Sequence, residues 1–172
     1  MNARITLAAL NAMPPEVFAA TLGAIYEHSP WFAERAAEKR PFDDLEQLQA
    51  AMASEVCNAA VREQLDLLLA HPELAGKAAI RGELTAESTR EQKGAGLDQC
   101  TPEEFDRLQA LNRAYREKFG FPFIIAVKGH TRQSILAAMS SRLQHDRERE
   151  LRECVEQVIQ IGRFRIAELV GA

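Results

Sequence analysis

A titratable histidine, His71, stands where a helix has to end. It opens the sequence His71-Pro72-Glu73-Leu74-Ala75-Gly76, and a proline disfavours helical geometry in the residue before it. An imidazole, with an ordinary pKa of about 6.5, exchanges a proton near neutral pH, and the start of a loop is a favourable place for a catalytic base. The alternative is that His71 only caps the preceding helix, where it would interact with the last carbonyls. The motif alone leaves both interpretations open.

A second polar group consists of Ser88, Glu91 and Gln92. Their spacing of i, i+3 and i+4 places them on one side of a short helix, which we expect from about Thr85 to Lys93. Three polar side chains on one face can surround a small polar ligand. The alternative is a solvated helix face, because further charged residues lie alongside them.

The last helix carries an arginine on its predicted core side. Counting about 100° per residue from Leu151, Arg165 falls at about −40°, among the apolar residues, and Arg163 falls at about 120°, near their edge. A buried guanidinium needs an anionic partner. That partner is either a structural carboxylate or the anionic group of a substrate.

The other histidines and charged residues fit surface positions. His28, His130 and His145 lie beside turn signals or charged runs. The run from Asp146 to Glu153 alternates in sign, which predicts an exposed helix. We therefore assign no catalytic role to these residues.

The three cysteines, Cys57, Cys100 and Cys154, predict neither a disulfide framework nor a zinc site. Their number is odd and no CxxC spacing occurs. Cys100 lies in a loop, but no histidine or lysine stands at a local spacing that would activate it. We expect no metal site and no organic cofactor.

The elements that position these residues are predicted to be helices. Pro15, Ser29-Pro30 and Asp43 each begin a stretch with helical spacing of apolar residues. The last of these, from Asp43 to Ala70, predicts one long helix or two consecutive helices that end before Pro72. Thr101-Pro102-Glu103-Glu104 is a capping box, and it opens a helix that Gly120 ends. Two further helices are expected, from about 132 to 143 and from about 145 to 170.

One segment breaks this helical pattern. Residues 121–127 are apolar without helical punctuation, and they predict an extended, buried segment that could be a lone strand. No second strand pattern is available to build a sheet. We therefore predict an all-α protein with seven or eight helices, forming a single compact domain over residues 1–172.

Length and composition agree with a globular protein of one domain. The chain has 172 residues, of which 47% are hydrophobic and 27% charged, and these values suit one folded domain. The net charge of −4 gives no basic surface for nucleic acid. The longest apolar stretch is far shorter than the about 20 residues that cross a bilayer, and no signal-peptide pattern is present. We expect a cytoplasmic protein that binds neither membrane nor nucleic acid.

Three ordered blocks of sequence resemble one family, the 2-oxo-4-hydroxy-4-carboxy-5-ureidoimidazoline (OHCU) decarboxylases, which form allantoin during urate degradation. The blocks are His71 to Gly76, Ser88 to Gln92 with Gly96-Leu97, and Leu111-Asn112 through Tyr115 to Ile124. The resemblance spans most of the chain. It implies a lyase of purine catabolism that acts on a small-molecule substrate, without a cofactor, as a homodimer.

The resemblance also implies roles for particular residues. His71 would be the catalytic acid/base, and we expect Glu91 to orient the imidazole ring and to stabilise its charged form. Pro72, Ser88 and Gln92 would contact the substrate, and so would Glu91. The extended segment would offer the backbone groups of Phe123, Ile124, Ile125, Ala126 and Val127. An arginine of the last helix would bind the substrate carboxylate, and helical phase favours Arg165 over Arg163.

Two other functions fit parts of the sequence. A non-catalytic helical module could bind a ureido compound or a partner helix with the same apolar segment, and it would not need His71. A ring-opening hydrolase would normally need a metal ion or an activated nucleophile, and the sequence indicates neither. We therefore favour the decarboxylase.

Overall fold

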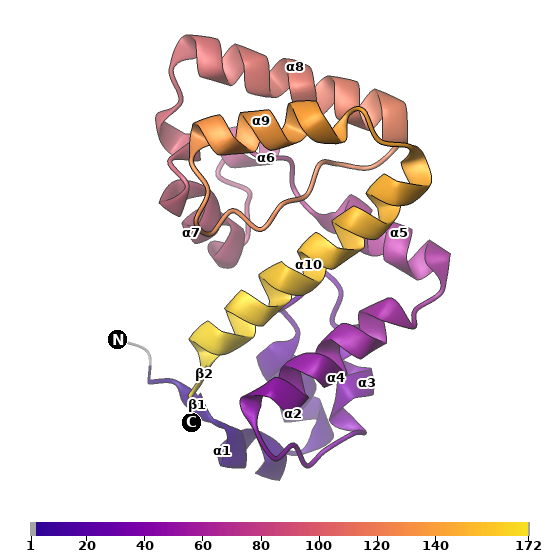
Figure 1. The fold of residues 1–172 in the computed structure, drawn as a ribbon. Helices are drawn as coiled ribbons and strands as arrows, with labels where there is room; N and C mark the ends of the chain where they lie inside the picture. The colour runs from indigo at the N-terminus through magenta and orange to yellow at the C-terminus, as the bar shows by residue number, and fades with distance from the viewer. Residues whose placement is uncertain (1–2, 172) are drawn as a thin grey trace. The chain divides into compact units, whose positions relative to one another are not determined.

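The computed structural model describes residues 3–171 and places most of them in helices (Figure 1). Ten α-helices and one 3₁₀ helix lie in this part of the chain. The predicted all-α fold class is confirmed. The structure adds two short helices to those expected, α1 (Leu7–Ala12) and α6 (Lys77–Ile80), because runs of six and four residues are too short to show a helical period.

The chain forms two compact units, with one boundary between Ala70 and His71 and the other inside the last helix. The first unit contains residues up to 70 together with those from 158 onward. Its remaining elements are β1 (Ile5–Thr6), α2 (Pro15–Leu22), α3 (Trp31–Ala37), α4 (Leu45–Cys57), α5 (Val61–Ala70), the second half of α10 (Arg147–Leu169) and β2 (Val170–Gly171). The second unit contains residues 71–157.

The first unit is built around buried apolar side chains from most of its helices. Fully buried members include Leu10, Phe18, Phe32, Leu48 and Met52. Its two strands pair in parallel, with Ile5 opposite Val170 and Thr6 opposite Gly171. The sequence did not predict this pair, because two residues are too few for an alternating pattern.

A polar side chain fixes the start of α4 in the first unit. The carboxylate of Asp44 accepts a hydrogen bond of 2.8 Å from the backbone N–H of Gln47, which caps α4. Asn58 ends that helix, so the long apolar stretch ending at Ala70 forms two helices rather than one. The prediction had left both possibilities open.

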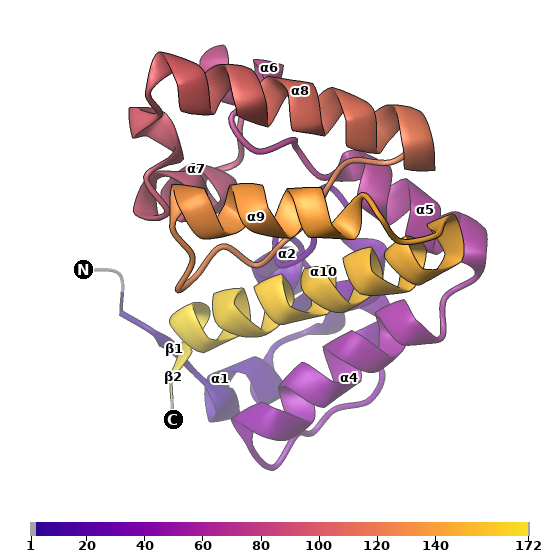
Figure 2. The ribbon, with the colours of Figure 1, turned by 45° about the horizontal axis from the view of Figure 1, so that its top comes forward.

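The second unit contains α6, α7 (Ala86–Gly94), the 3₁₀ helix η1 (Leu97–Gln99), α8 (Pro102–Phe119), α9 (Arg132–Arg142) and the first half of α10. Helices α8 and α9 pack side by side, as Figures 1 and 2 show. Thr101 and Glu104 form the predicted capping box at the start of α8. Gly120 ends α8 with a φ of 82°, a left-handed conformation that glycine adopts without strain.

The segment that follows α8 belongs to neither helix nor strand, and it is buried as predicted. Phe121 and Phe123 are at most 1% exposed, and their rings contact the ring of Tyr115 with centroid distances of 6.1 and 5.3 Å. Edge-to-face aromatic contacts of this kind favour a fixed arrangement. The segment is therefore held in place by side-chain packing, without a strand partner.

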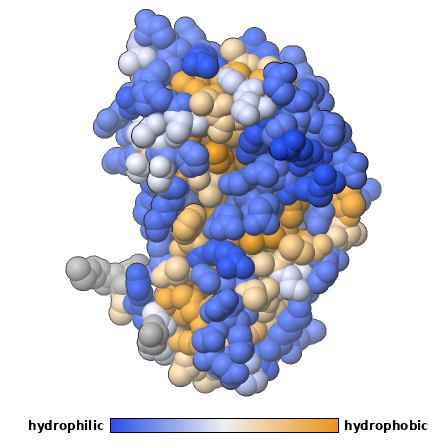
Figure 3. Space-filling view, viewed as in Figure 1, coloured by the Kyte–Doolittle hydropathy of each residue, from blue (hydrophilic) through white to orange (hydrophobic). Residues whose placement is uncertain are grey.

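Hydrophilic residues cover much of the drawn surface over α8 and α9, with smaller apolar areas between them (Figure 3). Among residues 3–171, no helix is long and apolar enough to cross a membrane.

Candidate active site

His71 is the first residue after α5, at the helix end that Pro72 predicts. Its side chain is not on the surface, because the residue is only 7% exposed and its Nε2 atom is buried. The two residues that follow Glu73 are also buried, and Ala75 has a φ of 50°. A titratable ring that is largely removed from water, on a tightly turned loop, is a frequent feature of catalytic sites.

Helix α7 carries the second group of predicted residues. The hydroxyl of Thr85 accepts a hydrogen bond of 3.2 Å from the N–H of Ser88, which starts the helix close to the expected position. Ser88 and Gln92 are 5% and 7% exposed, and Glu91 is partly exposed. The alternative of a solvated face is therefore wrong for Ser88 and Gln92.

Gln92 connects α7 directly to the loop that begins at His71. Its Oε1 accepts a hydrogen bond of 2.9 Å from the N–H of Ala75, and its Nε2 lies 3.4 Å from the carbonyl of Glu73. The structure thus brings Gln92 together with the loop of His71. The side chain holds the protein's own backbone, and its amide nitrogen carries a second N–H that a ligand can use.

The extended segment also uses part of its backbone inside the protein. The N–H of Ala126 donates to Oε1 of Gln157 at 2.9 Å, and the carbonyl of Ile124 accepts from Nη1 of Arg142 at 2.7 Å. The carbonyl of Val127 accepts a turn hydrogen bond from His130. The Ala126 N–H is therefore committed to the protein, whereas a carbonyl oxygen such as that of Ile124 keeps a second lone pair.

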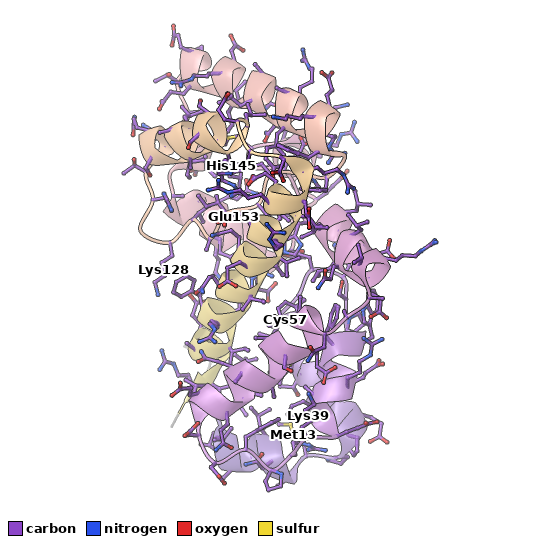
Figure 4. All side chains as sticks on the ribbon, turned by 45° about the vertical axis from the view of Figure 1, so that its right-hand side comes forward. Met13, Lys39, Cys57, Lys128, His145 and Glu153 are labelled. Carbon is purple, nitrogen blue, oxygen red and sulfur yellow. The ribbon has the colours of Figure 1, made fainter. Side chains whose placement is uncertain are left out.

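A buried group of polar side chains contacts this segment through Arg142. Arg142 pairs with Glu150 at 2.8 Å, and the hydroxyl of Tyr115 donates to the same carboxylate at 2.8 Å. Nδ1 of His145, labelled in Figure 4 just before α10, lies 3.3 Å from the other oxygen of Glu150. Sγ of Cys154 lies 3.1 Å from the Tyr115 hydroxyl.

Burial governs the protonation of this group. It raises the pKa of the Tyr115 hydroxyl well above its usual range, and it raises the pKa of the Cys154 thiol. Both groups are therefore neutral at neutral pH. The prediction that the run from Asp146 to Glu153 is an exposed face is wrong for Glu150, which is fully buried.

Arg165 lies in the first unit and is 5% exposed, while Arg163 is partly exposed, so the predicted helical phase is confirmed. The guanidinium of Arg165 donates to Glu27 at 2.9 Å and to the carbonyl of Ile25 at 3.2 Å. Glu27 is itself 2% exposed. One carboxylate partner of this buried arginine is therefore structural, which was the alternative to a substrate anion.

A cavity of about 430 Å³ lies in the second unit, on the side of α7 that carries Thr89 and Lys93. Its wall includes Ala75 and Gln92, but neither His71 nor Glu91.

Within residues 3–171, no three His, Cys, Asp or Glu side chains gather as metal ligands would.

The sequence did not predict the buried residues that hydrogen-bond the loop of His71 or hold Arg142 against the extended segment. Glu150 looks like a surface residue because charges of both signs surround it in the sequence. Gln109 and Asn112 of α8 donate hydrogen bonds to backbone carbonyls in the loop of His71. A single amide side chain in a sequence does not predict such a contact. The one usable signal was helical phase, since Asn112 shares a helix face with the apolar residues Leu108 and Tyr115.

Comparison with known proteins agrees with the resemblance of the three sequence blocks. A sequence model of the family described as OHCU decarboxylase matches residues 11–167. The 2-oxo-4-hydroxy-4-carboxy-5-ureidoimidazoline decarboxylase of Halalkalicoccus jeotgali is 42% identical over 96% of this chain and 92% of its own. The uric acid degradation bifunctional protein of Bacillus subtilis is also 42% identical, over 96% of this chain and 33% of its own.

Solved structures give the same picture. A crystal structure of (S)-allantoin synthase matches with a TM-score of 0.79 and 33% identity, covering 96% of this chain and 54% of that one. A crystal structure of OHCU decarboxylase in the presence of (S)-allantoin has a TM-score of 0.67 over 91% of this chain and 98% of its own. At 20% identity, it shows the fold alone. The family match, the 42% identity over nearly the whole chain and the shared fold lead to one conclusion: this chain belongs to the OHCU decarboxylase family.

Proposed function

We propose that this protein decarboxylates 2-oxo-4-hydroxy-4-carboxy-5-ureidoimidazoline to (S)-allantoin in urate degradation, with His71 as the acid/base. The observation that carries the proposal is the position of His71, a buried imidazole at a helix end, in a chain 42% identical to an OHCU decarboxylase. A relative 33% identical to this chain is an (S)-allantoin synthase, which supports the S enantiomer as product.

The reaction does not call for an organic cofactor. When the bond between the ring carbon and the carboxylate breaks, carbon dioxide leaves and the electron pair stays on the ring carbon. The adjacent imine of the imidazoline can accept that pair, so the substrate supplies its own electron sink. The enzyme has to orient the carboxylate out of the ring plane and stabilise the developing negative charge. It then has to protonate one face of the neighbouring ring carbon, which carries the ureido group, while the hydroxyl on the first carbon loses its proton and becomes the carbonyl of allantoin.

His71 suits the proton transfer in this scheme. A neutral or charged imidazole interconverts near neutral pH, and a positioned general acid or base contributes about 10² to 10⁴ in rate. We assign Glu91 to orient the imidazole and to stabilise its charged form. A proton delivered from one fixed side of the ring accounts for a single enantiomer of allantoin.

The remaining predicted residues would hold the substrate. Ser88, Gln92 and Pro72 would contact the polar ring, and the backbone of residues 123–127 would bind the ureido and ring amides. The Ala126 N–H already serves Gln157, so we assign this role to the other backbone groups of the segment. The polar ligand groups then meet donors and acceptors that are already fixed by the protein.

Arg165 would bind an anionic group of the substrate. Its guanidinium carries five N–H donors, and the bonds to Glu27 and to the carbonyl of Ile25 use two of them. A very strong grip on the departing carboxylate would stabilise the ground state and slow the reaction. The carboxylate of Glu27 neutralises part of the positive charge of Arg165, which weakens the attraction between Arg165 and the substrate carboxylate.

We further propose that the protein acts as a homodimer in the cytoplasm, with residues 1–172 as one functional domain. Decarboxylation is tested by adding the purified protein to freshly generated urate-oxidation product and following carbon dioxide release and optical rotation. An enzyme releases carbon dioxide faster than the uncatalysed reaction and builds up one sign of rotation. A module that only binds a ureido compound would change neither.

A further inference from the structure

The loop from His71 to Gly76 obtains little support from its own backbone. Within residues 72–76, a turn hydrogen bond of 3.3 Å joins the N–H of Gly76 to the carbonyl of Glu73, and the carbonyl of Gly76 accepts from the N–H of Ile80 at 3.1 Å. Leu74 and Ala75 are nevertheless 7% and 6% exposed, and buried backbone groups require partners. Ala75 also has a left-handed φ of 50°, which an alanine adopts only when its surroundings impose it. Contacts from elsewhere must therefore fix the path of this loop.

Three amide side chains supply those contacts, and we call them the loop clamp: Gln92, Gln109 and Asn112. Nδ2 of Asn112 donates to the carbonyl of Leu74 at 3.0 Å. Nε2 of Gln109 donates to the carbonyl of Ala75 at 2.8 Å. Gln92 accepts from the N–H of Ala75 and donates to the carbonyl of Glu73. Three consecutive carbonyls of the loop thus each receive an amide N–H from the clamp.

Asn112 contributes little to the stability of the folded protein. It is 1% exposed, and among residues 3–171 its Oδ1 atom has no hydrogen-bond partner. Burying an amide oxygen without a partner offsets much of what the single bond from Nδ2 contributes. The side chain does hold the Leu74 carbonyl in one orientation, because only Nδ2, the donor end of the amide, can face that carbonyl. Its contribution is therefore better sought in the placement of the loop.

We infer that Asn112 and Gln109 are positioning residues for His71, and this inference rests on the proposed role of His71 as acid/base. The clamp holds the loop at the second to fourth residues after His71. The rigid ring of Pro72 connects this held part of the loop to His71. A general acid has to lie within hydrogen-bond reach of the atom it protonates. A misplacement of about 1 Å can lower the rate by about 10²-fold.

The test compares single variants that keep side-chain size but remove the donor: Asn112→Leu and Gln109→Met. Arg116→Gln is the matched control, because Arg116 lies on the same helix, is itself half-exposed and pairs with the side-chain carboxylate of Glu73, not with the loop backbone. His71→Asn is measured alongside. The readouts are kcat and KM, the urea midpoint, and the NMR signals and titration of the His71 ring. With four histidines in the chain, these signals are identified by their loss in His71→Asn.

We expect each clamp variant to lower kcat by about 10- to 100-fold, to change KM by less than about threefold and to shift the His71 ring signals. Arg116→Gln should change none of these. Lower stability with unchanged kcat and unchanged His71 signals would overturn the inference and leave the clamp a purely structural role. If Asn112→Leu does not fold, the half-buried Gln109→Met decides the same question.

Failure of the proposed function would look different. If His71→Asn kept full activity, His71 would not be the acid/base, whatever the clamp variants do. The NMR signals would still decide whether Asn112 and Gln109 hold the His71 ring in place. A shifted ring signal supports the inference, and an unshifted one contradicts it.

Discussion

Arg142 and Glu150 form an ion pair inside the second unit, with 2.8 Å between Nε and Oε1, and neither side chain is more than 8% exposed. The same guanidinium donates to the carbonyl of Ile124. A carboxylate in the charged run of α10 is therefore connected through one arginine to the backbone of the extended segment. This segment is the one to which we assign substrate contacts.

Removing one member of this pair should destabilise the protein strongly. In Glu150→Ala, Arg142 would remain buried without its carboxylate, which typically costs about 3 to 5 kcal/mol. Urea unfolding followed by circular dichroism measures the change. Glu148→Ala is the control, because Glu148 pairs with Arg152 on an exposed face and should leave the unfolding free energy nearly unchanged. Equal losses in both variants would contradict the importance of burial.

The two tyrosines, Tyr26 and Tyr115, should stay protonated in the folded protein at pH values where an ordinary tyrosine, with a pKa of 10.0, ionises. Burial raises the pKa of both hydroxyls above the ordinary value of 10.0. A raised pKa in the folded state means that the unfolded state loses its protons first. The stabilising contribution is therefore complete below about pH 10 and is lost as the pH rises further.

Absorbance at 295 nm, recorded with circular dichroism, tests this expectation. The phenolate signal should appear together with unfolding. A phenolate signal from a protein that still has its native circular dichroism would show that the hydroxyls are more accessible than the structure indicates.

Arg165→Ala should lower both turnover and stability more than Arg163→Ala. Loss of Arg165 removes the guanidinium that pairs with the buried carboxylate of Glu27, and it also removes the proposed substrate contact. The double variant Arg165→Met with Glu27→Gln separates the two effects, because it removes both charges at once. We expect it to recover stability but not turnover. Recovery of turnover as well would leave Arg165 with a structural role only.

Treatment with a chelator should leave turnover unchanged. The proposed chemistry places the electron pair on the substrate itself, and no step requires a metal ion. Dialysis against EDTA followed by the carbon dioxide assay is the measurement. Activity that falls on dialysis and returns with added Zn²⁺ or Mg²⁺ would contradict this part of the proposal.

Local rules predicted much of the helical framework from the sequence. The capping box at Thr101 and the stop at Gly120 lie where expected, and Pro72 marks the end of α5 correctly. Helical phase placed Arg165 on the buried side of α10. These features depend on neighbours within one or two helical turns, so the sequence alone contains the necessary information.

The features that the sequence did not predict depend on contacts between distant segments. Glu150 is buried because Arg142 and Tyr115 meet it from other helices, and alternating charges hide such a residue. Asn112 reaches Leu74 across an interval that no local pattern describes. The two-residue strands likewise exist only because the two ends of the chain pair.

The role of His71 is the central claim, and the variant His71→Asn tests it most directly. Turnover, melting temperature and affinity for (S)-allantoin should be measured on the same preparation. We predict a rate lower by about 10²-fold or more, with allantoin binding retained and the melting temperature little changed. A histidine that only capped α5 would instead lower stability by about 0.5 to 1 kcal/mol and leave the chemistry intact. A destabilised but fully active His71→Asn enzyme would contradict the proposed mechanism.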